Sequence, residues 1–483
     1  MAGKRDRDVD TEEEEIIFES RLPSFELPDV DMTLPEFVFD GFEPYADKVA
    51  IVDSSDGRKY TYGEFTRLIK NTASGLASIG VKKGDVVCIV LPNVAEYYIL
   101  VFGILTVGGI FSGCNPYAHS SEIQKQIQNS EAKLVITDPT TLHKVMDINV
   151  PIVIVGGEAP SNTIAVETLF TADGSKAPAV SISPDDVCLL PYSSGTTGLQ
   201  KGVMITHRSM VSNLCQTLCQ RQTRFSVEQL LPHETILGLM PFFHIYGISG
   251  IGCAQFRSRG TVVVMERYEI RRLLQVLIDY EVTFAPLVPP IILSLVKSPI
   301  LEEFDLSALK LRGILCAAAP LRFDLQQAFE EKFPGVLMSQ AYGLTEYSCA
   351  TMSFSPLMDG VNIMPAKQGS VGVIMIGTKV KFLDPSTGRS LPANTHGELC
   401  VKGPATMRGY FKNASATESI IDQDGWLHTG DIGYIDEDGD VFIVDRLKEL
   451  IKYKGFQVPP AELEALLLSH PAVTDAAVIG QVA

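Results

Sequence analysis

Residues 187–202 read VCLLPYSSGTTGLQKG, an apolar run followed by a loop rich in glycine and hydroxyl groups. The run Val187–Pro191 predicts a buried strand, because it is short and apolar and turn-forming residues follow it. Two glycines let the next backbone N–H groups turn inward, four hydroxyls add donors, and Lys201 adds a mobile positive charge. These groups suit a triphosphate, and a purely structural loop of the same composition is the alternative.

The spacing within this loop differs from the GxxxxGK[ST] pattern of a Walker A motif. Lys201 lies six residues after Gly195 and is followed by glycine. The loop therefore predicts a phosphate site of another kind, placed directly after a buried strand.

Short apolar runs alternate with helical patterns over most of the chain. This alternation predicts an α/β fold whose parallel-rich sheets are covered on both faces by helices. The expected strands are Val86–Leu91, Leu134–Thr137, Ile152–Val155, Val187–Pro191, Ile236–Met240, Val262–Met265, Phe284–Val288 and Gly313–Cys316. Beyond about Gly369 the pattern changes to hairpins, with Lys379–Leu383, Gly397–Lys402, Asp431–Asp436 and Val441–Val444 as strands, which predicts an antiparallel, β-barrel-like unit.

These patterns divide the chain into three parts. Residues 1–20 form an acidic tail, predicted to be disordered because its clustered like charges repel and do not bury. Residues 21–444 form the large domain, with 370–444 as its barrel-like subdomain. Residues 445–483 contain a charged link and the helix Ala461–Ser469, and they number fewer than the roughly 50 residues of the smallest usual domains. We therefore interpret them as a hinge and an incomplete small α+β domain.

The composition restricts the classes of binding partner and the cellular compartment to be expected. With 58 acidic and 40 basic side chains the formal net charge is −18, which disfavours a surface that neutralises nucleic acid. The nine cysteines include no CxxC pair, so neither a disulfide framework nor a zinc site is expected. A cytoplasmic location fits best, and a peroxisomal one is the alternative if a C-terminal extension is missing. The oligomeric state stays open.

Two uncharged stretches, Tyr97–Ser121 and Thr235–Phe256, are long enough to raise the question of a membrane span. Glycines interrupt both stretches, and Pro116 and Pro241 break them. We therefore expect buried segments, a helix ending in a turn in the first case, and no membrane span.

Two further segments carry groups that suit a nucleotide. Gln340-Ala341-Tyr342-Gly343-Leu344-Thr345-Glu346 offers an aromatic face for a purine and hard oxygens of the kind that Mg²⁺ prefers, although such a heptapeptide is more often a turn. Trp426-Leu427-His428-Thr429-Gly430-Asp431 ends in a carboxylate that could accept from two sugar hydroxyls or stay a solvated strand-end residue.

In this order, and with Asp445-Arg446 after them, the three segments resemble the adenylate-forming superfamily of acyl-CoA synthetases, luciferases and adenylation domains. The resemblance runs from about Glu43 to the end of the chain. Within the superfamily, 4-coumarate–CoA ligases and their relatives are most similar, through Pro241–Gly247, Ala318–Leu321 and Lys452–Gln457. The resemblance implies ATP, Mg²⁺ and coenzyme A as cofactors and a carboxylic acid as substrate, which is activated as acyl-AMP and passed to the thiol.

The resemblance also implies roles for single residues. The β- and γ-phosphates would be held by Ser193, Ser194, Gly195, Thr196, Thr197 and Lys201. Adenine would be framed by Ala317, Ala318, Ala319, Pro320, Tyr342 and Gly343, with Thr345 on phosphate, Glu346 on the metal, and Asp431 and Arg446 on ribose. His244 would line the acyl pocket and Lys448 the hinge, and Lys454 and Gly455 would approach the second-step nucleophile. For His244 a satisfied core histidine is the alternative, and for Lys448 an exposed linker charge.

The sequence departs from the family at two places that bear on activity. No lysine occurs after Lys454, whereas the family ends in a glycine-lysine motif, and losing such a charge costs about 10²–10³ in rate. We therefore expect impaired adenylation, and a nucleotide-binding protein without turnover is an alternative, as is a luciferase-like oxygenase. Leu315 stands where hydroxycinnamate ligases have lysine, so the acid is expected to be aromatic or medium- to long-chain aliphatic.

Overall fold

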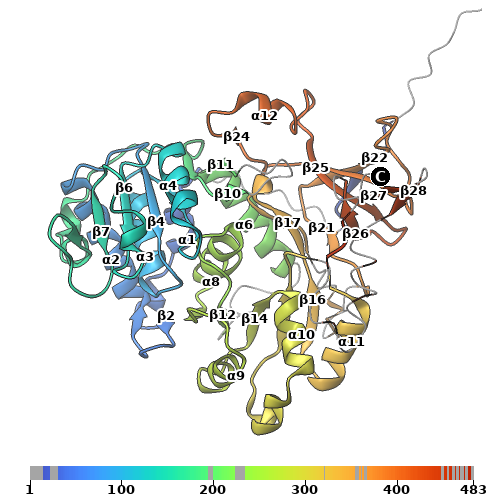
Figure 1. The fold of residues 1–483 in the computed structure, drawn as a ribbon, viewed down its shortest axis with the longest axis horizontal. Coiled ribbons are helices and arrows are strands. Elements are labelled where there is room, and N and C mark those ends of the chain that lie inside the picture. Colours follow the sequence, from blue (N-terminus) through green and yellow to red (C-terminus); the bar gives the residue numbers. More distant parts are fainter. Residues whose placement is uncertain are drawn as a thin grey trace, which may run out of the picture.

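The computed structural model describes residues 15–21, 31–193, 200–222, 234–319, 321–353, 358–359, 362–363, 367–447, 451–453, 456–458, 463, 467, 473 and 477–479. Three sheets organise this part of the chain, two with mainly parallel strands and one antiparallel (Figure 1). The α/β fold expected from the sequence is confirmed.

The first sheet has the strand order β10-β11-β9-β5-β4-β6-β7-β8, and β24 pairs with β11 off this path. From β9 to β8 successive strands run parallel, whereas β10, β11 and β24 are antiparallel to their neighbours. The strands are β4 Val86–Val90, β5 Ile110–Gly113, β6 Leu134–Thr137, β7 Ile152–Ile154, β8 Ile164–Ala165, β9 Val187–Leu189, β10 Tyr192–Ser193, β11 Lys201–Thr206 and β24 Gly409–Tyr410.

The second sheet has the order β16-β15-β14-β12-β13-β2-β3, parallel except for the β2–β3 pair. Its strands are β2 Val49–Asp53, β3 Lys59–Thr61, β12 Thr235–Gly238, β13 Thr261–Val264, β14 Phe284–Leu287, β15 Gly313–Cys316 and β16 Leu337–Gln340. Every strand predicted for the α/β part is present, with ends that differ by at most two residues.

Helices connect the parallel strands. The α-helices are α1 Leu34–Phe39, α2 Tyr62–Ser78, α3 Glu96–Thr106, α4 Ser120–Asn129, α5 Glu167–Phe170, α6 His207–Gln222, α8 Ala254–Arg257, α9 Ile270–Asp279, α10 Pro289–Lys297, α11 Phe323–Lys332 and α12 Ala414–Glu418. Short 3-10 turns are η1 Glu43–Tyr45, η2 Leu142–Lys144, η3 Gly174–Lys176, η5 Pro299–Glu303, η6 Leu306–Ala308 and η7 Thr345–Tyr347. Helix α2 begins at a capping box, in which the Thr61 hydroxyl accepts from the Glu64 N–H and the Glu64 carboxylate accepts from the Thr61 N–H.

One hydrophobic core runs through both parallel-rich sheets and the helices between them. Its centre is aromatic: the Tyr98 ring lies 4.5 Å from Phe242 and 5.2 Å from Phe256, measured between centroids. Helix α3 is buried along almost its whole length, and its Tyr97 and Tyr98 are fully buried. The uncharged stretches of the sequence therefore supply this core. Nowhere in the described ranges does a helix reach the length and apolarity needed to cross a membrane.

Two features of these stretches were not predicted. Residues 110–113 form strand β5, because after α3 the chain returns to the sheet beside β4. Residues Tyr246–Cys253 form a π-helix, η4, that continues into α8. The widened turn fits a glycine-rich segment at a close approach, since a Cβ on Gly247 would lie 2.2 Å from the Pro241 carbonyl oxygen.

The third sheet is antiparallel, with the order β1-β22-β23-β25-β26-β21-β18-β17. Its strands are β1 Phe18–Glu19, β17 Tyr342–Leu344, β18 Cys349–Ser353, β21 Gly372–Ile374, β22 Lys379–Leu383, β23 Gly397–Lys402, β25 Leu427–Ile435 and β26 Asp440–Arg446. Two short hairpins, β19 Met358–Asp359 with β20 Asn362–Ile363 and β27 Ile451–Tyr453 with β28 Phe456–Val458, lie apart from it. The hairpins predicted from the sequence are present.

Two predicted boundaries are wrong. The tail was expected to extend to residue 20, but Phe18 pairs with Val380, and Lys379 and Lys381 form ion pairs with Glu19 and Glu15. Opposite charge on β22 offsets the repulsion among the acids. The large domain was expected to end at residue 444, but β26 continues to Arg446. Most of the predicted helix Ala461–Ser469 lies outside the described residues.

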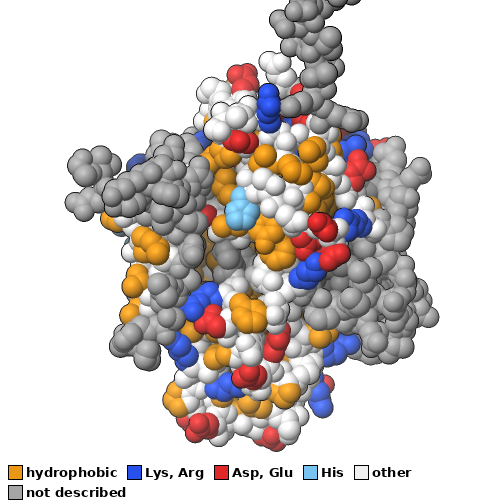
Figure 2. Space-filling model, turned by 90° about the vertical axis from the view of Figure 1, so that its right-hand side faces the viewer, with side chains coloured by type: hydrophobic (Ala, Val, Ile, Leu, Met, Phe, Trp, Pro, Cys, Tyr) orange, Lys and Arg blue, Asp and Glu red, His pale blue; other side chains and the backbone are white. Residues whose placement is uncertain are grey.

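The acidic excess is not gathered in one block on the face that Figure 2 presents. Acidic and basic side chains lie interspersed there among hydrophobic ones. This mixture agrees with the many ion pairs between exposed side chains, each of which contributes little to stability.

Asn93, between β4 and α3, links the two parallel-rich sheets. Its buried Nδ2 donates to the carbonyl oxygens of Leu239 and Met240, both at 3.1 Å, and its Oδ1 accepts from the Phe242 N–H at 2.9 Å. These bonds hold the loop after β12, which leads to His244. Asn93 was not singled out from the sequence, because an isolated asparagine after a strand usually marks a turn.

We expect Asn93→Leu to lower the free energy of unfolding by about 1–3 kcal/mol, since it leaves buried backbone groups unpaired. Chemical denaturation of the purified chain measures the change. Asn149→Ala, at an exposed position, is the matched control and should change stability little. Equal stability of the two variants would contradict the linking role of Asn93.

Candidate nucleotide and acyl site

The phosphate loop joins two paired strands. Ser193 of β10 lies opposite Lys201 of β11, so the two ends of the loop are neighbours. Both ends therefore face the same site, as a loop that wraps one ligand requires. The predicted phosphate ligands Ser194, Gly195, Thr196 and Thr197 lie outside the described residues.

Glu346 lies at the centre of the site and is 9% exposed. Its Oε1 accepts two hydrogen bonds, from the Ser193 hydroxyl at 2.8 Å and from the Tyr410 hydroxyl at 2.9 Å. Within the described part of the chain, Oε2 has no hydrogen-bond partner. A buried carboxylate with one oxygen fixed and the other available fits a Mg²⁺ ligand beside phosphates.

Tyr410 is a site residue that the sequence did not reveal. Strand β24 pairs with β11, with Val203 opposite Tyr410, and this pairing carries the tyrosine to Glu346. The ring of Tyr410 also lies 5.1 Å from the Lys201 ammonium. Burial, and next the charge of Glu346, raise the pKa of Tyr410 well above its ordinary value, so its hydroxyl keeps the proton that it donates.

A second cluster forms around Asp431. The Tyr342 hydroxyl donates to Asp431 Oδ2 at 2.5 Å, and Arg446 Nε lies 3.5 Å from Asp431 Oδ1. Asp431 and Arg446 are direct partners in the β25–β26 pair. Burial and the nearby Asp431 charge raise the pKa of Tyr342, so this phenol also stays protonated.

Segment 342–346 joins the two clusters, and its backbone tolerates little change at Gly343. A Cβ there would lie 1.8 Å from the Cys349 carbonyl oxygen, across the tight β17–β18 pair. Glycine is therefore required for chain packing, whatever its part in binding a nucleotide.

The predicted adenine segment follows strand β15. Ala317 follows β15 and Ala341 follows β16, and the Ala341 N–H donates to Cys316, because the two parallel strands are neighbours. Ala318 has φ +74°, a left-handed conformation that is uncommon for a residue with a Cβ and often marks functional sites. Ala318 and Ala319 are exposed, and Pro320 lies outside the described residues. The segment lies at the carboxyl ends of the strands, where open α/β sheets bind ligands.

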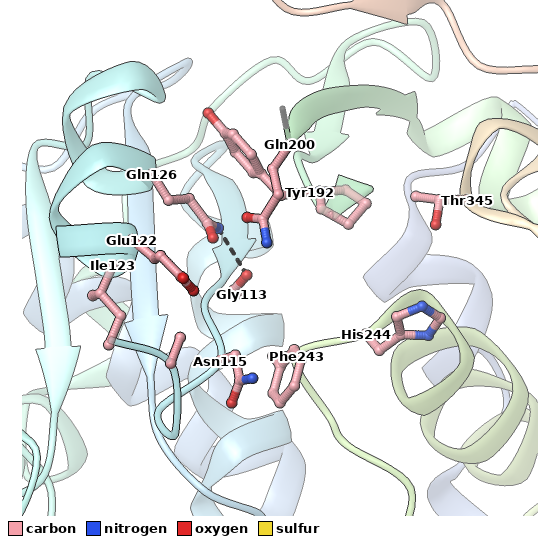
Figure 3. Close-up of a pocket in the computed structure, with 12 residues that line it drawn as sticks. Gly113, Asn115, Glu122, Ile123, Gln126, Tyr192, Gln200, Phe243, His244 and Thr345 are labelled. Carbon is pink, nitrogen blue, oxygen red and sulfur yellow. Dashed lines mark hydrogen bonds between the residues drawn. The ribbon is translucent and has the colours of Figure 1, made fainter. Parts of the chain in front are cut away.

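A pocket opens between α4 and the phosphate loop, with an empty volume of about 560 Å³ that includes its solvent-filled mouth (Figure 3). His244 and Thr345 lie on one side of it, and Glu122 and Gln126 of α4 lie on the other. The complete lining is Gly113, Asn115, Ala118, Glu122, Ile123, Gln126, Pro191, Tyr192, Gln200, Phe243, His244 and Thr345. The buried Gln126 amide donates to the Gly113 carbonyl at 2.9 Å and so fixes this wall.

His244 is exposed toward the pocket and is not a core histidine. Its Nδ1 accepts from the Tyr246 N–H at 3.3 Å, which orients the ring. Desolvation lowers the pKa of His244, and the charge of Glu346 opposes this effect without reversing it. The imidazole is therefore neutral near pH 7, and because Nδ1 accepts from Tyr246, the proton lies on Nε2.

Most predicted site residues that can be described meet here. Ser193, Lys201, Thr345 and Glu346 lie around the phosphate loop and the pocket, and Tyr342, Asp431 and Arg446 form the second cluster. The structure adds the pocket residues Asn115, Glu122, Gln126 and Tyr192, for which no local sequence pattern gave a signal. Lys448, Lys454 and Gly455 lie outside the described residues.

Fold and site define an α/β nucleotide-binding protein, and the comparisons with known proteins agree. Residues 40–411 match the model of the AMP-binding enzyme family. The chain belongs to this family, and within it to the adenylate-forming acid–CoA ligases.

Two plant proteins and one solved structure illustrate the similarity. The chain is 53% identical over 479 residues to 4-coumarate–CoA ligase-like 9 of Oryza sativa subsp. japonica, covering 98% of this chain and 85% of that protein. It is 39% identical over 475 residues to 4-coumarate–CoA ligase 1 of Petroselinum crispum, covering 96% and 85%. ATP-bound MatB from Rhodopseudomonas palustris superposes with a TM-score of 0.81 at 26% identity, covering 93% of this chain and 86% of that one.

We expect two histidines of this region to titrate in opposite directions from the ordinary value of about 6.5. The pKa of His244 is lowered by desolvation, whereas the hydrogen bond that His428 donates to the Glu398 carboxylate raises the pKa of His428. An NMR pH titration of the imidazole resonances, assigned with His244→Gln and His428→Gln, measures both. A higher midpoint for His244 than for His428 would contradict the environments described.

These two pKa shifts also determine how the free energy of unfolding changes with pH. Below a pH of about 6.5, His244 takes up a proton more readily in the unfolded chain, whose histidine pKa is about 6.5, than in the folded protein, whose pKa is lower. The free energy of unfolding therefore decreases as the pH falls from about 6.5 toward the folded pKa. His428 stabilises the fold below about 6.5, and this contribution is lost as the pH rises through its raised pKa.

Proposed function

We propose that this protein activates a carboxylic acid with ATP and transfers the acyl group to coenzyme A. In the first step the carboxylate oxygen attacks the α-phosphorus, the bond to the bridging oxygen breaks, and pyrophosphate leaves. In the second step the thiolate sulfur attacks the acyl carbonyl carbon and AMP leaves. One observation carries the proposal: the short segment 342–346 connects two sets of hydrogen bonds. Glu346 at its end accepts from Ser193 and Tyr410, and Tyr342 at its start donates to Asp431.

The chain's own groups position and neutralise charge in this proposal. Ser193 and Lys201 would approach the phosphates, and Asp431, held by Tyr342, would accept from the ribose hydroxyls. Thr345 would donate to phosphate from its place beside the pocket. Glu346 would hold Mg²⁺, which when bound offsets phosphate charge.

Neutral His244 would lie next to the reacting carboxylate. A positive charge beside the substrate carboxylate would stabilise it before the reaction and so raise the barrier, and a neutral imidazole avoids this effect. The neutral ring is able to donate one hydrogen bond to an oxygen. Its position on the same side of the pocket as Thr345 supports this role (Figure 3).

We propose an aromatic or medium- to long-chain aliphatic acid as the substrate. Leu315 supplies an apolar, half-buried side chain in β15, and the Tyr246 hydroxyl lies 3.4 Å from its carbonyl oxygen. An apolar side chain at position 315 favours an acid without a polar ring substituent, because such a substituent beside it would lose its hydrogen bonds to water. The cytoplasmic location stays a prediction.

The substrate class is tested first by binding and then by turnover. Calorimetry with non-hydrolysable acyl-sulfamoyl adenosines, which mimic the acyl adenylate, should show the tightest binding for aromatic or medium- to long-chain acyl groups. Failure of every analogue to bind would contradict the proposal.

Acid-dependent release of pyrophosphate, followed with and without coenzyme A, then separates the alternatives. A thioester formed only with coenzyme A is expected. Binding without pyrophosphate release would favour a nucleotide-binding protein without turnover, and adenylate consumption with oxygen in place of a thiol would favour a luciferase-like reaction.

We expect Tyr410→Phe to weaken magnesium-dependent ATP binding about 10–100-fold, because the Glu346 carboxylate loses one of the two donors that orient it. Titration of ATP at several Mg²⁺ concentrations measures the effect. Tyr434→Phe is the matched control, since Tyr434 stacks between His396 and Phe442 in the third sheet. Equal affinity of the two variants would show that the Tyr410 hydroxyl does not support the site.

A further inference from the structure

Away from the pocket, the antiparallel sheet gathers a thiol, an imidazole and a carboxylate. Cys400 Sγ lies 3.5 Å from His428 Nδ1, and Glu398 Oε2 lies 3.2 Å from the same nitrogen. The three candidate ligand atoms all lie within 4.8 Å of one another. Two of these residues are partly buried and Cys400 is fully buried, so the cluster is part of the folded sheet.

Strand pairing creates this arrangement. Cys400 of β23 lies directly opposite His428 of β25. Glu398 and Cys400 lie two positions apart and so face the same side of their strand. His428 therefore lies against Cys400 and diagonal to Glu398, and a bulge in β25 follows, where three residues lie opposite a single residue of β23.

Hydrogen bonding satisfies the His428–Glu398 pair and leaves the Cys400 thiol as the weakest partner in this cluster. The Nδ1 atom carries either one proton or one lone pair, so it serves one of its two neighbours at a time. If the Cys400 thiol donates to Nδ1 of His428, that nitrogen carries no proton for the Glu398 carboxylate. If Nδ1–H donates to Glu398, the thiol keeps only a weak contact with the ring. A cation between the three atoms would satisfy all of them.

The two separations that involve Nδ1 agree with tetrahedral coordination, and the sulfur and the carboxylate lie within 4.8 Å of each other. Zinc bonds of about 2.3 Å to sulfur and about 2.0–2.2 Å to nitrogen and oxygen place S and N ligands about 3.6 Å apart and N and O ligands about 3.4 Å apart. The observed separations are 3.5 and 3.2 Å. Thiolate, imidazole and carboxylate together select Zn²⁺ over Mg²⁺ or Ca²⁺.

Asp422 completes the pattern on the other side of the ring. Its Oδ2 lies 3.6 Å from His428 Nε2, and its Oδ1 is fixed by the N–H groups of Asp424 and Trp426. A carboxylate facing the outer nitrogen is the usual partner of a metal-binding histidine, because it orients the ring and sets its tautomer.

We propose that Glu398, Cys400 and His428 form a Zn²⁺ site, oriented by Asp422 and separate from the nucleotide site. On binding, the Sγ–H proton passes to solvent, and so does the Nδ1–H proton where the ring is an imidazolium. Nε2 keeps its proton toward Asp422, and the thiolate, the neutral Nδ1 and the carboxylate each form a bond to zinc. The His428 side chain is 28% exposed and the Asp422 side chain 31%, so water has access from this side and takes the fourth position.

The neighbouring cation does not prevent this role. Lys381 lies opposite Cys400 in the β22–β23 pair, but its ammonium pairs with Glu15 and lies 4.4 Å from the centroid of the Trp426 ring. Its charge is thereby largely balanced. Burial, and next the charge of Glu398, raise the pKa of Cys400, so the thiol gives up its proton only when a cation binds.

Cobalt titration of the whole chain tests the proposal. Co²⁺ replaces Zn²⁺ in such sites and gives a thiolate-to-metal charge-transfer absorption only when sulfur is a ligand. We expect this absorption with one equivalent of Co²⁺, its loss in Cys400→Ser, and its displacement by Zn²⁺. Cys349→Ser is the control, a half-buried cysteine outside the cluster, and should keep the absorption.

Two further variants keep the test valid if Cys400→Ser fails to fold. Glu398→Gln should weaken Co²⁺ binding at least tenfold, and Asp422→Asn should weaken it about 10–100-fold while leaving the charge-transfer band in place. Circular dichroism confirms the fold of each variant. No charge-transfer absorption in the unaltered chain, or an equal one in Cys400→Ser, would overturn the proposal and leave a hydrogen-bonded cluster only.

Discussion

The two hydrogen bonds that Glu346 accepts are the constraint on which the site depends. One donor, Ser193, lies 153 residues earlier in the chain, and the other, Tyr410, lies 64 residues later. Both hydroxyls aim at the same oxygen of a buried carboxylate, so the first sheet, segment 342–346 and strand β24 are held in one arrangement. Because an unpaired buried carboxylate is costly, any displacement of one part weakens the others.

Sequence patterns succeeded where the determining interactions are local. Strands such as Leu134–Thr137 and Gly313–Cys316 were located to the residue, because a short apolar run between turn signals specifies a strand buried on both faces. The same logic located the hairpin at Asp438-Gly439. Family motifs singled out the phosphate loop and the Tyr342 segment, and of the described residues Ser193 at one end of the loop contacts Glu346 at the end of that segment.

Long-range pairing is where local patterns gave no information. Tyr410 reaches Glu346 only because two residues of β24 pair with β11, and Asn93 is important only because the loop after β12 lies against it. Neither contact leaves a periodicity in the sequence. The tail boundary failed for the same reason, since the partners of Glu15 and Glu19 are lysines of β22.

The bulge in β25 lies between two clusters of side chains. Strand β25 has three residues between His428 and Ile432 where β23 has one, so residues 429–431 leave the regular ladder while His428 stays opposite Cys400. His428 contacts Cys400, and Asp431 accepts from Tyr342. A cation at Cys400 would fix one end of the segment whose other end carries Asp431, the partner of Tyr342, so the rigidity of the bulge bears on both clusters.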